Sequence, residues 1–277
     1  MKHSSQTFKK RKSISSTIAR YVFAGTVVIL VIILGLNYSS SKKHMTAVIL
    51  EKAQHQAEEF GGSINQVFAS AQRIPIVMAS QLNQMEDWSS RDLSRMLESM
   101  LLENPDIFGA TIAFEPGMYQ GLPHMAPYAY RKDSVVASSL LFEGGNNYFM
   151  EDRYIIPVQL QEPYWSDPYY ETSAGQEEVL MITYSVPFFT QQDGKRVVAG
   201  VTTVDISLRW INNLMESLAV YQTGYGFLIA NSGRYVYHPD QHLRMNETTF
   251  SAMDEWIVSN QDLSAAEADT IRNQQFS

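Results

Sequence analysis

The chain contains no cysteine among its 277 residues, so disulfides, thiolate metal sites and cysteine nucleophiles are all excluded. It also lacks the short motifs of common catalysts: a nucleophile elbow, a phosphate-binding loop and the paired histidines of zinc peptidases. His238 and His242 are four residues apart, but Pro239 between them disrupts helical ligand spacing. The sequence therefore predicts neither an enzyme nor a bound metal or cofactor.

Basic residues are scarce after the first twenty positions. Residues 1–20 hold six Lys or Arg and no acid, whereas the rest of the chain holds 15 basic and 29 acidic residues. A body this acidic, without a basic patch interleaved with aromatics, is not expected to bind nucleic acid. Hydrophobic residues make up 45% of the chain, which is ample for a packed core.

One long hydrophobic run is present, the uncharged residues 21–38. Its length nearly covers a hydrocarbon core of roughly 30 Å, and Tyr21 and Tyr38 stand at its edges. A cleaved signal peptide is the alternative, but no small-residue cleavage site follows the run. The six positive charges before it predict a cytoplasmic tail (1–20), a transmembrane helix (21–38) and an external body.

Hydrophobic periodicity divides that body into helices and strands. A helical stripe runs to about Ile74, where Pro75 is expected to end or kink the helix, and a second helix covers 91–103 with Ser90 as its N-cap. Strand patterns follow at 107–116, 127–132, 179–189 and 196–206, and Asp-Gly at 193–194 predicts a hairpin between the last two. A helix at 207–220 and a short hairpin at 226–237 complete the pattern. These elements predict an α+β fold, an antiparallel sheet with helices on one face and an aromatic loop on the other.

Aromatic side chains are concentrated between the predicted strands, in a loop covering 146–171. Seven aromatics occur there within 23 residues, and Asp205 ends the strand that follows. Aromatics with a few charges, backed by a sheet, form the kind of concave wall that binds a small polar molecule. This pattern favours a binding site over an active site.

Several segments resemble the extracytoplasmic double Cache (PAS-like) sensor family of bacterial transmembrane signalling proteins. The matching pieces cover most of residues 107–240 in the family's order: APYAYRKD (126–133), DRYIIP (152–157), PYWSDPYY (163–170), MITYSVPFF (181–189), GVTTVDISLRWI (200–211) and GYGFLIANSGRYVYHPD (224–240). The resemblance implies a stalk helix with a membrane-distal subdomain over 39–219 and an incomplete membrane-proximal subdomain over 220–277. It also implies an output domain, such as a methyl-accepting or kinase domain, that would follow in the chain.

The resemblance places three ligand-contacting side chains. Tyr154 corresponds to the loop tyrosine, Tyr169 to the tyrosine of the Asp-Pro-Tyr segment, and Asp205 to the aspartate that pairs with a ligand ammonium group. The sequence departs from the amine- and amino-acid-binding branch at Arg153, where that branch has tryptophan, and at Glu151, where it has arginine. These departures put in doubt the clamp for a ligand carboxylate, and hence a plain α-amino acid.

Each candidate residue also has a structural alternative. Asp205 could cap the helix that starts near Ser207, and Tyr154 and Tyr169 could simply pack. Trp165 could anchor its loop, and Tyr184 is expected in the core because it shares a strand face with apolar residues. Tyr148 belongs to the aromatic wall, whereas Arg131 and Arg153 could hold a ligand carboxylate or form ion pairs.

The sequence thus predicts the sensing region of a bacterial inner-membrane receptor, such as a chemoreceptor or a histidine kinase, which dimerises through its stalk helix and binds an amine- or amino-acid-like solute. A membrane-tethered solute-binding module without signalling output is the alternative. A tethered hydrolase would need a catalytic constellation that the sequence does not contain.

Overall fold

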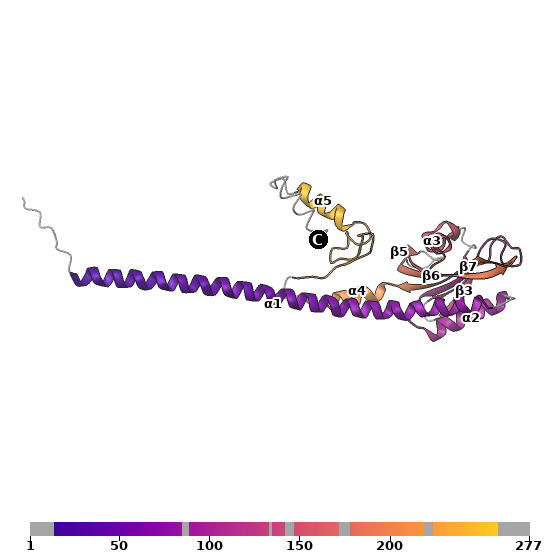
Figure 1. Ribbon diagram of the computed structural model, residues 1–277, viewed down its shortest axis with the longest axis horizontal. Helices are drawn as coiled ribbons and strands as arrows, with labels where there is room; N and C mark the ends of the chain where they lie inside the picture. Colours follow the sequence, from indigo (N-terminus) through magenta and orange to yellow (C-terminus); the bar gives the residue numbers. More distant parts are fainter. Residues whose placement is uncertain are drawn as a thin grey trace, which may run out of the picture. The chain divides into compact units, whose positions relative to one another are not determined.

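The computed structural model describes residues 14–84, 89–132, 135–141, 147–171, 178–218 and 224–259. Its contacts divide the chain into two units, residues 1–59 and 60–277 (Figure 1). Helix α1 (Ile14–Leu82) contributes to both units. Most of the basic tail predicted for 1–20 lies outside the described residues.

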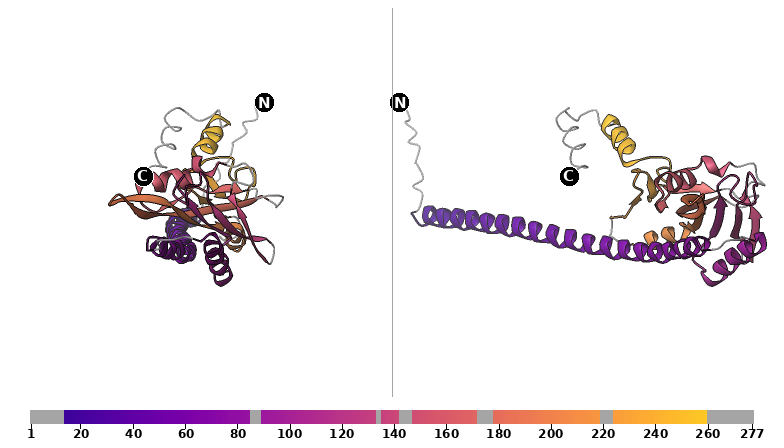
Figure 2. Two further views of the ribbon diagram at one scale, coloured as in Figure 1. Left: turned by 90° about the vertical axis from the view of Figure 1, so that its right-hand side faces the viewer. Right: turned by 45° about the vertical axis from the view of Figure 1, so that its right-hand side comes forward.

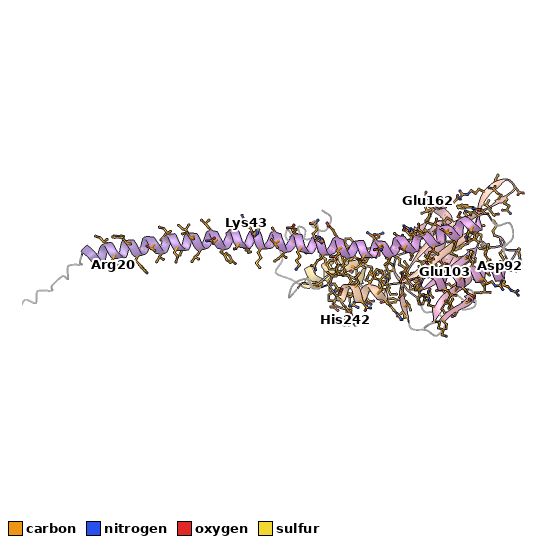
Figure 3. The ribbon with its side chains drawn as sticks, turned by 90° about the horizontal axis from the view of Figure 1, so that it is seen from below. Arg20, Lys43, Asp92, Glu103, Glu162 and His242 are labelled. Atoms are coloured by element: carbon orange, nitrogen blue, oxygen red, sulfur yellow. The ribbon has the colours of Figure 1, made fainter. Side chains whose placement is uncertain are left out.

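In the first unit, α1 is a single exposed helix that is apolar over 21–38 and largely polar after it. Its side chains, among them Arg20 and Lys43, project from all sides of the helix (Figure 3). The stretch from Ile18 onward is long and apolar enough to cross a membrane, with a mean hydropathy of 2.3 over 18 residues. This helix contains the span predicted at 21–38.

Pro75 was expected to end or kink this helix. It does not end it, because α1 continues to Leu82 with the proline inside it. Proline removes one backbone hydrogen bond from a helix interior. Here Ala71, Met78, Ala79 and Leu82 are buried on one face, on both sides of the proline, so packing outweighs that loss.

Helix α2 (Ser90–Glu103) confirms the second predicted helix. Its N-cap is Ser89 rather than the predicted Ser90, and the Ser89 carbonyl accepts the first helical hydrogen bonds from Asp92 and Leu93. Four apolar residues on one side of α2 are buried, which fixes the face that it turns to the sheet: Leu93, Leu97, Met100 and Leu101.

The second unit is built on an antiparallel sheet with the order β3-β2-β1-β7-β6-β4, in which β5 also pairs with β6. The seven strands are β1 (Gly109–Phe114), β2 (Pro127–Lys132), β3 (Val135–Leu140), β4 (Tyr164–Trp165), β5 (Tyr169–Glu171), β6 (Val179–Gln192) and β7 (Lys195–Ser207). The predicted hairpin is confirmed: Asp193 and Gly194 both have positive φ, as a tight two-residue turn requires. The sequence pattern did not predict strand β3.

The two faces of the sheet have different coverings. Helices α1 and α2 lie on one face, and helix α3 (Asp152–Leu160) lies on the other (Figure 1, Figure 2). The predicted α+β architecture is therefore confirmed, but helices cover both faces, because α3 lies on the face that was expected to carry only an irregular aromatic loop. The face that α1 and α2 cover is apolar. It includes four fully buried side chains: Ile112, Phe188, Val204 and Ile206.

The segment predicted as an irregular loop is partly regular. A short 3-10 helix, η2 (Tyr148–Met150), leads into α3, and β4 and β5 follow. Pro157 lies inside α3, which is why the sequence pattern did not indicate a helix. The helix ends at Leu160, and its C-cap Gln161 has a left-handed backbone (φ 56°) that turns the chain toward β4.

Beyond β7 the chain forms a helix and a small hairpin. Helix α4 (Arg209–Glu216) is shorter than the helix predicted for 207–220, whose last two residues lie outside the described part. Strands β8 (Leu228–Ile229) and β9 (Tyr235–Tyr237) confirm the predicted hairpin, and α5 (Thr249–Ser259) follows.

Candidate functional site

A cavity lies on the polar face of the sheet, beneath α3. Strands β1, β2 and β7 supply its floor, and η2, α3 and β5 supply its wall. About 50 Å³ is open to the centre of a water molecule, which is room for a few waters or one small solute. Its lining is formed by Thr111, Ala113, Tyr128, Leu141, Tyr148, Glu151, Arg153, Tyr154, Glu171, Thr203 and Asp205.

Asp205 is the most deeply buried acid of this lining, at 6% exposure. Its strand position places it opposite Gly109 of β1 and Thr183 of β6, and the Thr183 hydroxyl donates a 2.7 Å hydrogen bond to its Oδ1. Burial raises the pKa of Asp205, while the positive charge of Arg153 and the Thr183 hydroxyl oppose that shift. Such a carboxylate stays ionised most readily when a cation enters the cavity beside it.

The helix-cap alternative for Asp205 is wrong. Helix α4 starts at Arg209 and its N-cap is Leu208, three residues beyond the aspartate. The Asp205 carbonyl accepts a hydrogen bond from the Phe108 amide, and its carboxylate is directed to the neighbouring strand.

A chain of hydroxyls supports the carboxylate. The Tyr169 and Thr183 hydroxyl oxygens are 2.7 Å apart, and a hydroxyl has only one hydrogen to donate. Since Thr183 donates to Asp205, Tyr169 must donate to Thr183. These two hydrogen bonds, from Tyr169 to Thr183 and from Thr183 to Asp205, therefore orient the carboxylate without bringing a positive charge to it.

Gly109 leaves room for this arrangement. A Cβ at position 109 would collide with the Tyr128 hydroxyl and stand 2.9 Å from Asp205 Oδ2. Tyr128, whose hydroxyl also hydrogen-bonds Asp205, can thus lie directly across the end of β1. Burial and the adjacent Asp205 charge raise the pKa of Tyr128, so it remains a neutral hydrogen-bond donor.

Arg153 forms the charged part of the wall. Its guanidinium is 2.5 Å from Glu151 and 3.3 Å from Glu171, and it lies 4.5 Å from the centre of the Tyr169 ring. Burial acts to lower the pKa of Arg153, but Tyr169 and the three nearby carboxylates, Glu151, Asp205 and Glu171, raise it further. Arg153 is therefore always charged and already has two acidic partners.

Aromatic rings complete the wall. Tyr148 and Phe149 both meet Tyr154 edge to face, with ring centres 5.0 and 4.9 Å apart. The Tyr154 hydroxyl donates a 2.6 Å hydrogen bond to Glu115. Burial raises the pKa of Tyr154, and this hydrogen bond raises it further. The cavity thus combines hydroxyl donors, carboxylates and aromatic faces.

The structure brings five of the seven predicted residues together: Asp205, Tyr154, Arg153 and Tyr148 line the cavity, and Tyr169 supports it. Trp165 lies elsewhere, against Phe68 of α1 and Tyr184 of β6, and Tyr184 belongs to the core as expected. Arg131 donates hydrogen bonds to the carbonyls of Leu101, Asn104 and Ile107 at the end of α2.

Sequence reasoning missed Tyr128, Thr183 and Glu171 as parts of this site. Their strands are separated along the chain, and only the register of the sheet brings them to Asp205. The alternation of Thr183 with apolar residues in β6 was the available signal, since it places a polar side chain on the same face as Asp205. Among the described residues, no group of three or more acidic or histidine side chains could hold a metal ion.

Comparison with known proteins agrees with this geometry. Residues 93–213 match the family model described as the methyl-accepting chemotaxis protein-like, first PDC sensor domain. A 78-residue stretch is 33% identical to the methyl-accepting chemotaxis protein PscA of Pseudomonas syringae pv. tomato. That match covers 28% of this chain and 11% of PscA, so the chain spans only a small part of that relative.

Solved structures share the fold. The extracellular domain of the candidate histidine kinase mmHK1S-Z2 has a TM-score of 0.62 at 20% identity, over 73% of this chain and 77% of that one. The ligand-binding domain of the Pseudomonas aeruginosa amino acid chemoreceptor PctC, in complex with GABA, has a TM-score of 0.51 at 17% identity, over 70% and 77% of the two chains. The predicted resemblance is confirmed: residues 93–213 match a PDC sensor domain of the double Cache type, and the chain shares the fold of the sensor domains of a chemoreceptor and of a candidate histidine kinase.

Proposed function

We propose that this chain is the extracytoplasmic sensing region of a bacterial transmembrane signalling receptor, and that its cavity binds a small solute carrying an ammonium group. The observation that carries the proposal is the buried carboxylate of Asp205 on the cavity floor. A buried charge is costly unless it is paired, and a ligand ammonium group would supply the missing partner. The complex of PctC with GABA, a primary amine, supports the same ligand chemistry.

The wall of the cavity supports a cationic ligand as well. The faces of Tyr148 and Tyr154 in the lining are electron-rich, and aromatic faces attract ammonium groups within about 6 Å. Arg153 already makes a contact of this kind beside the cavity, at 4.5 Å from the centre of the Tyr169 ring.

The route to the membrane would be helix α1. Its residues Ala71, Met78 and Leu82 pack on the apolar face of the same strands that carry Asp205 and Thr111 on the other face. A ligand that binds one arrangement of the sheet better than another would shift the population of α1 positions. The exposed apolar residues Met45, Val48 and Ile49 in the first unit support pairing of α1 with a second copy of the chain.

The test is a thermal-shift screen of the full chain in detergent micelles against amines, amino acids and organic acids. A ligand that binds only the folded state raises the melting temperature, by an amount that grows with ligand concentration. We expect at least one amine or amino acid to raise it and dicarboxylic acids to leave it unchanged. Stabilisation by organic acids alone would contradict the proposal.

A further inference from the structure

We infer that this cavity selects a short diamine, a solute with two ammonium groups and no carboxylate. The inference rests on the proposed function and narrows it, because it names which amine-bearing solutes the cavity prefers. Three features of the cavity carry it: the balance of charges, the position of the carboxylates and the engagement of Arg153.

The lining holds more negative than positive charge. Glu151, Glu171 and Asp205 are acidic, and Arg153 is the single basic residue among the described lining residues, which gives a formal charge of −2 when all are ionised. A zwitterion would leave that charge unchanged and a monoamine would reduce it by one. A diamine would balance it completely.

The carboxylates stand at two depths. Asp205 is 6% exposed and receives hydroxyl hydrogen bonds, and no ion pair to it is formed among the described residues. The side chains of Glu151 and Glu171 are 37% and 21% exposed and lie nearer the opening. One ammonium group would pair with Asp205 in the floor, and the second would meet the two glutamates near the opening.

Arg153 offers little to a ligand carboxylate. Its guanidinium contacts Glu151 and Glu171 and stacks on Tyr169, so its donors face groups that already belong to the protein. A carboxylate entering here would have to displace a glutamate and would then face three acids. An ammonium group would instead share the glutamates with Arg153, and the more exposed Glu151 could reorient toward it at little cost.

The size of the cavity limits the diamine to a short one. Its volume of about 50 Å³, counted for the centres of water molecules, admits a chain of a few carbon atoms between the two nitrogens. Three solutes with the same number of carbon atoms, four, then form a series: 1,4-diaminobutane, 1-aminobutane and 4-aminobutanoate. They differ only in the group at one end, which is cationic, apolar or anionic.

The experiment is isothermal titration of the full chain in detergent with each of these three solutes, using the natural chain, Glu151→Gln and the control Glu162→Gln. Glu162 is an exposed acid just past the end of α3 and does not line the cavity (Figure 3). We expect 1,4-diaminobutane to bind at least about tenfold more tightly than either other solute. Glu151→Gln should reduce that preference several-fold, and Glu162→Gln should preserve it.

The outcomes separate this inference from the proposed function. If 1-aminobutane or 4-aminobutanoate binds as tightly as the diamine, or if an α-amino acid binds and the diamine does not, the diamine inference fails and the proposed function stands. A preference that persists unchanged in Glu151→Gln would also overturn the inference. If the chain binds no amine and no amino acid, both fail together.

Discussion

The two faces of the sensor sheet use the same strands for different purposes. On β1, Ile112 is completely buried against α1 and α2, whereas its neighbour Thr111 lines the cavity on the opposite face. On β7, Val204 packs in the core and Asp205 lies in the cavity floor. Because side chains alternate along a strand, one set of backbone hydrogen bonds supports both a stable core and a polar site.

The difference between the faces shows how a sheet can carry a buried acid. On the apolar face, each side chain that is removed from water stabilises the folded state. The cavity face contributes less of this stabilisation because it contains a buried carboxylate. Hydroxyls from neighbouring strands donate hydrogen bonds to that carboxylate: Thr183 from β6 and Tyr128 from β2. The residue that stabilises the sheet least, Asp205, therefore lies where a bound ligand can supply the ion pair that the described residues do not.

The largest expected effect contrasts adjacent residues of β1. Ile112→Ala removes buried atoms from the core and should lower the free energy of unfolding by about 2–5 kcal/mol. Thr111→Ala, at the cavity, should lower it by about 1 kcal/mol or less, because the truncated side chain borders space already open to water. Chemical denaturation of both variants measures the contrast. Equal losses would mean that the two faces do not differ in their contribution to stability.

Much of this contrast could be predicted from the sequence. Alternation along the strand predicted at 196–206 places Asp205 on one face with Val197, Ala199, Val201 and Thr203. Val201 and Thr203 do lie on the cavity side. The same prediction failed farther along β7, where Ala199 belongs to the opposite face. The register shifts beside Phe188 and Phe189, and such a bulge reverses the alternation without a clear mark in the sequence.

The partners of the cavity residues could not be predicted in the same way. Arg153 was expected to hold a carboxylate or form an ion pair, but its partner Glu171 lies on another element, and only the folded chain shows the distance between them. Arg131 was a candidate ligand residue because arginine suits carboxylates. It instead satisfies carbonyls at the end of α2, which local pattern does not reveal.

The dependence of stability on pH should sharpen the comparison further, with a smaller effect. Burial is the main cause of the raised pKa values of Asp205 and Glu151. An acid whose pKa is raised on folding stabilises the folded state fully when the pH is below its ordinary pKa. This stabilisation is lost as the pH rises through the pKa that the acid has in the folded state. Melting of the unliganded full chain between about pH 4 and pH 7 should therefore reveal a loss that is reduced in Asp205→Asn.

Ligand affinity should change in the opposite direction over that range, because a cationic solute pairs with the deprotonated acids. Affinity for an amine should rise as pH increases through the raised pKa values of Asp205 and Glu151. Calorimetry in buffers of different ionisation enthalpy detects the protons released on binding. Identical pH profiles for the natural chain and Asp205→Asn would contradict the assignment of this titration to Asp205.

The most direct test of the central claim is calorimetric titration of two variants with the amine that binds the natural full chain. Asp205→Asn keeps the shape of the side chain and removes its charge, so affinity should weaken by about 1.5–3 kcal/mol, or roughly 10- to 150-fold. Asp92→Asn makes the same change at an exposed site on α2, outside the cavity lining, and should leave affinity unchanged. Unchanged affinity in Asp205→Asn, with its melting temperature preserved, would show that this carboxylate does not recognise the ligand.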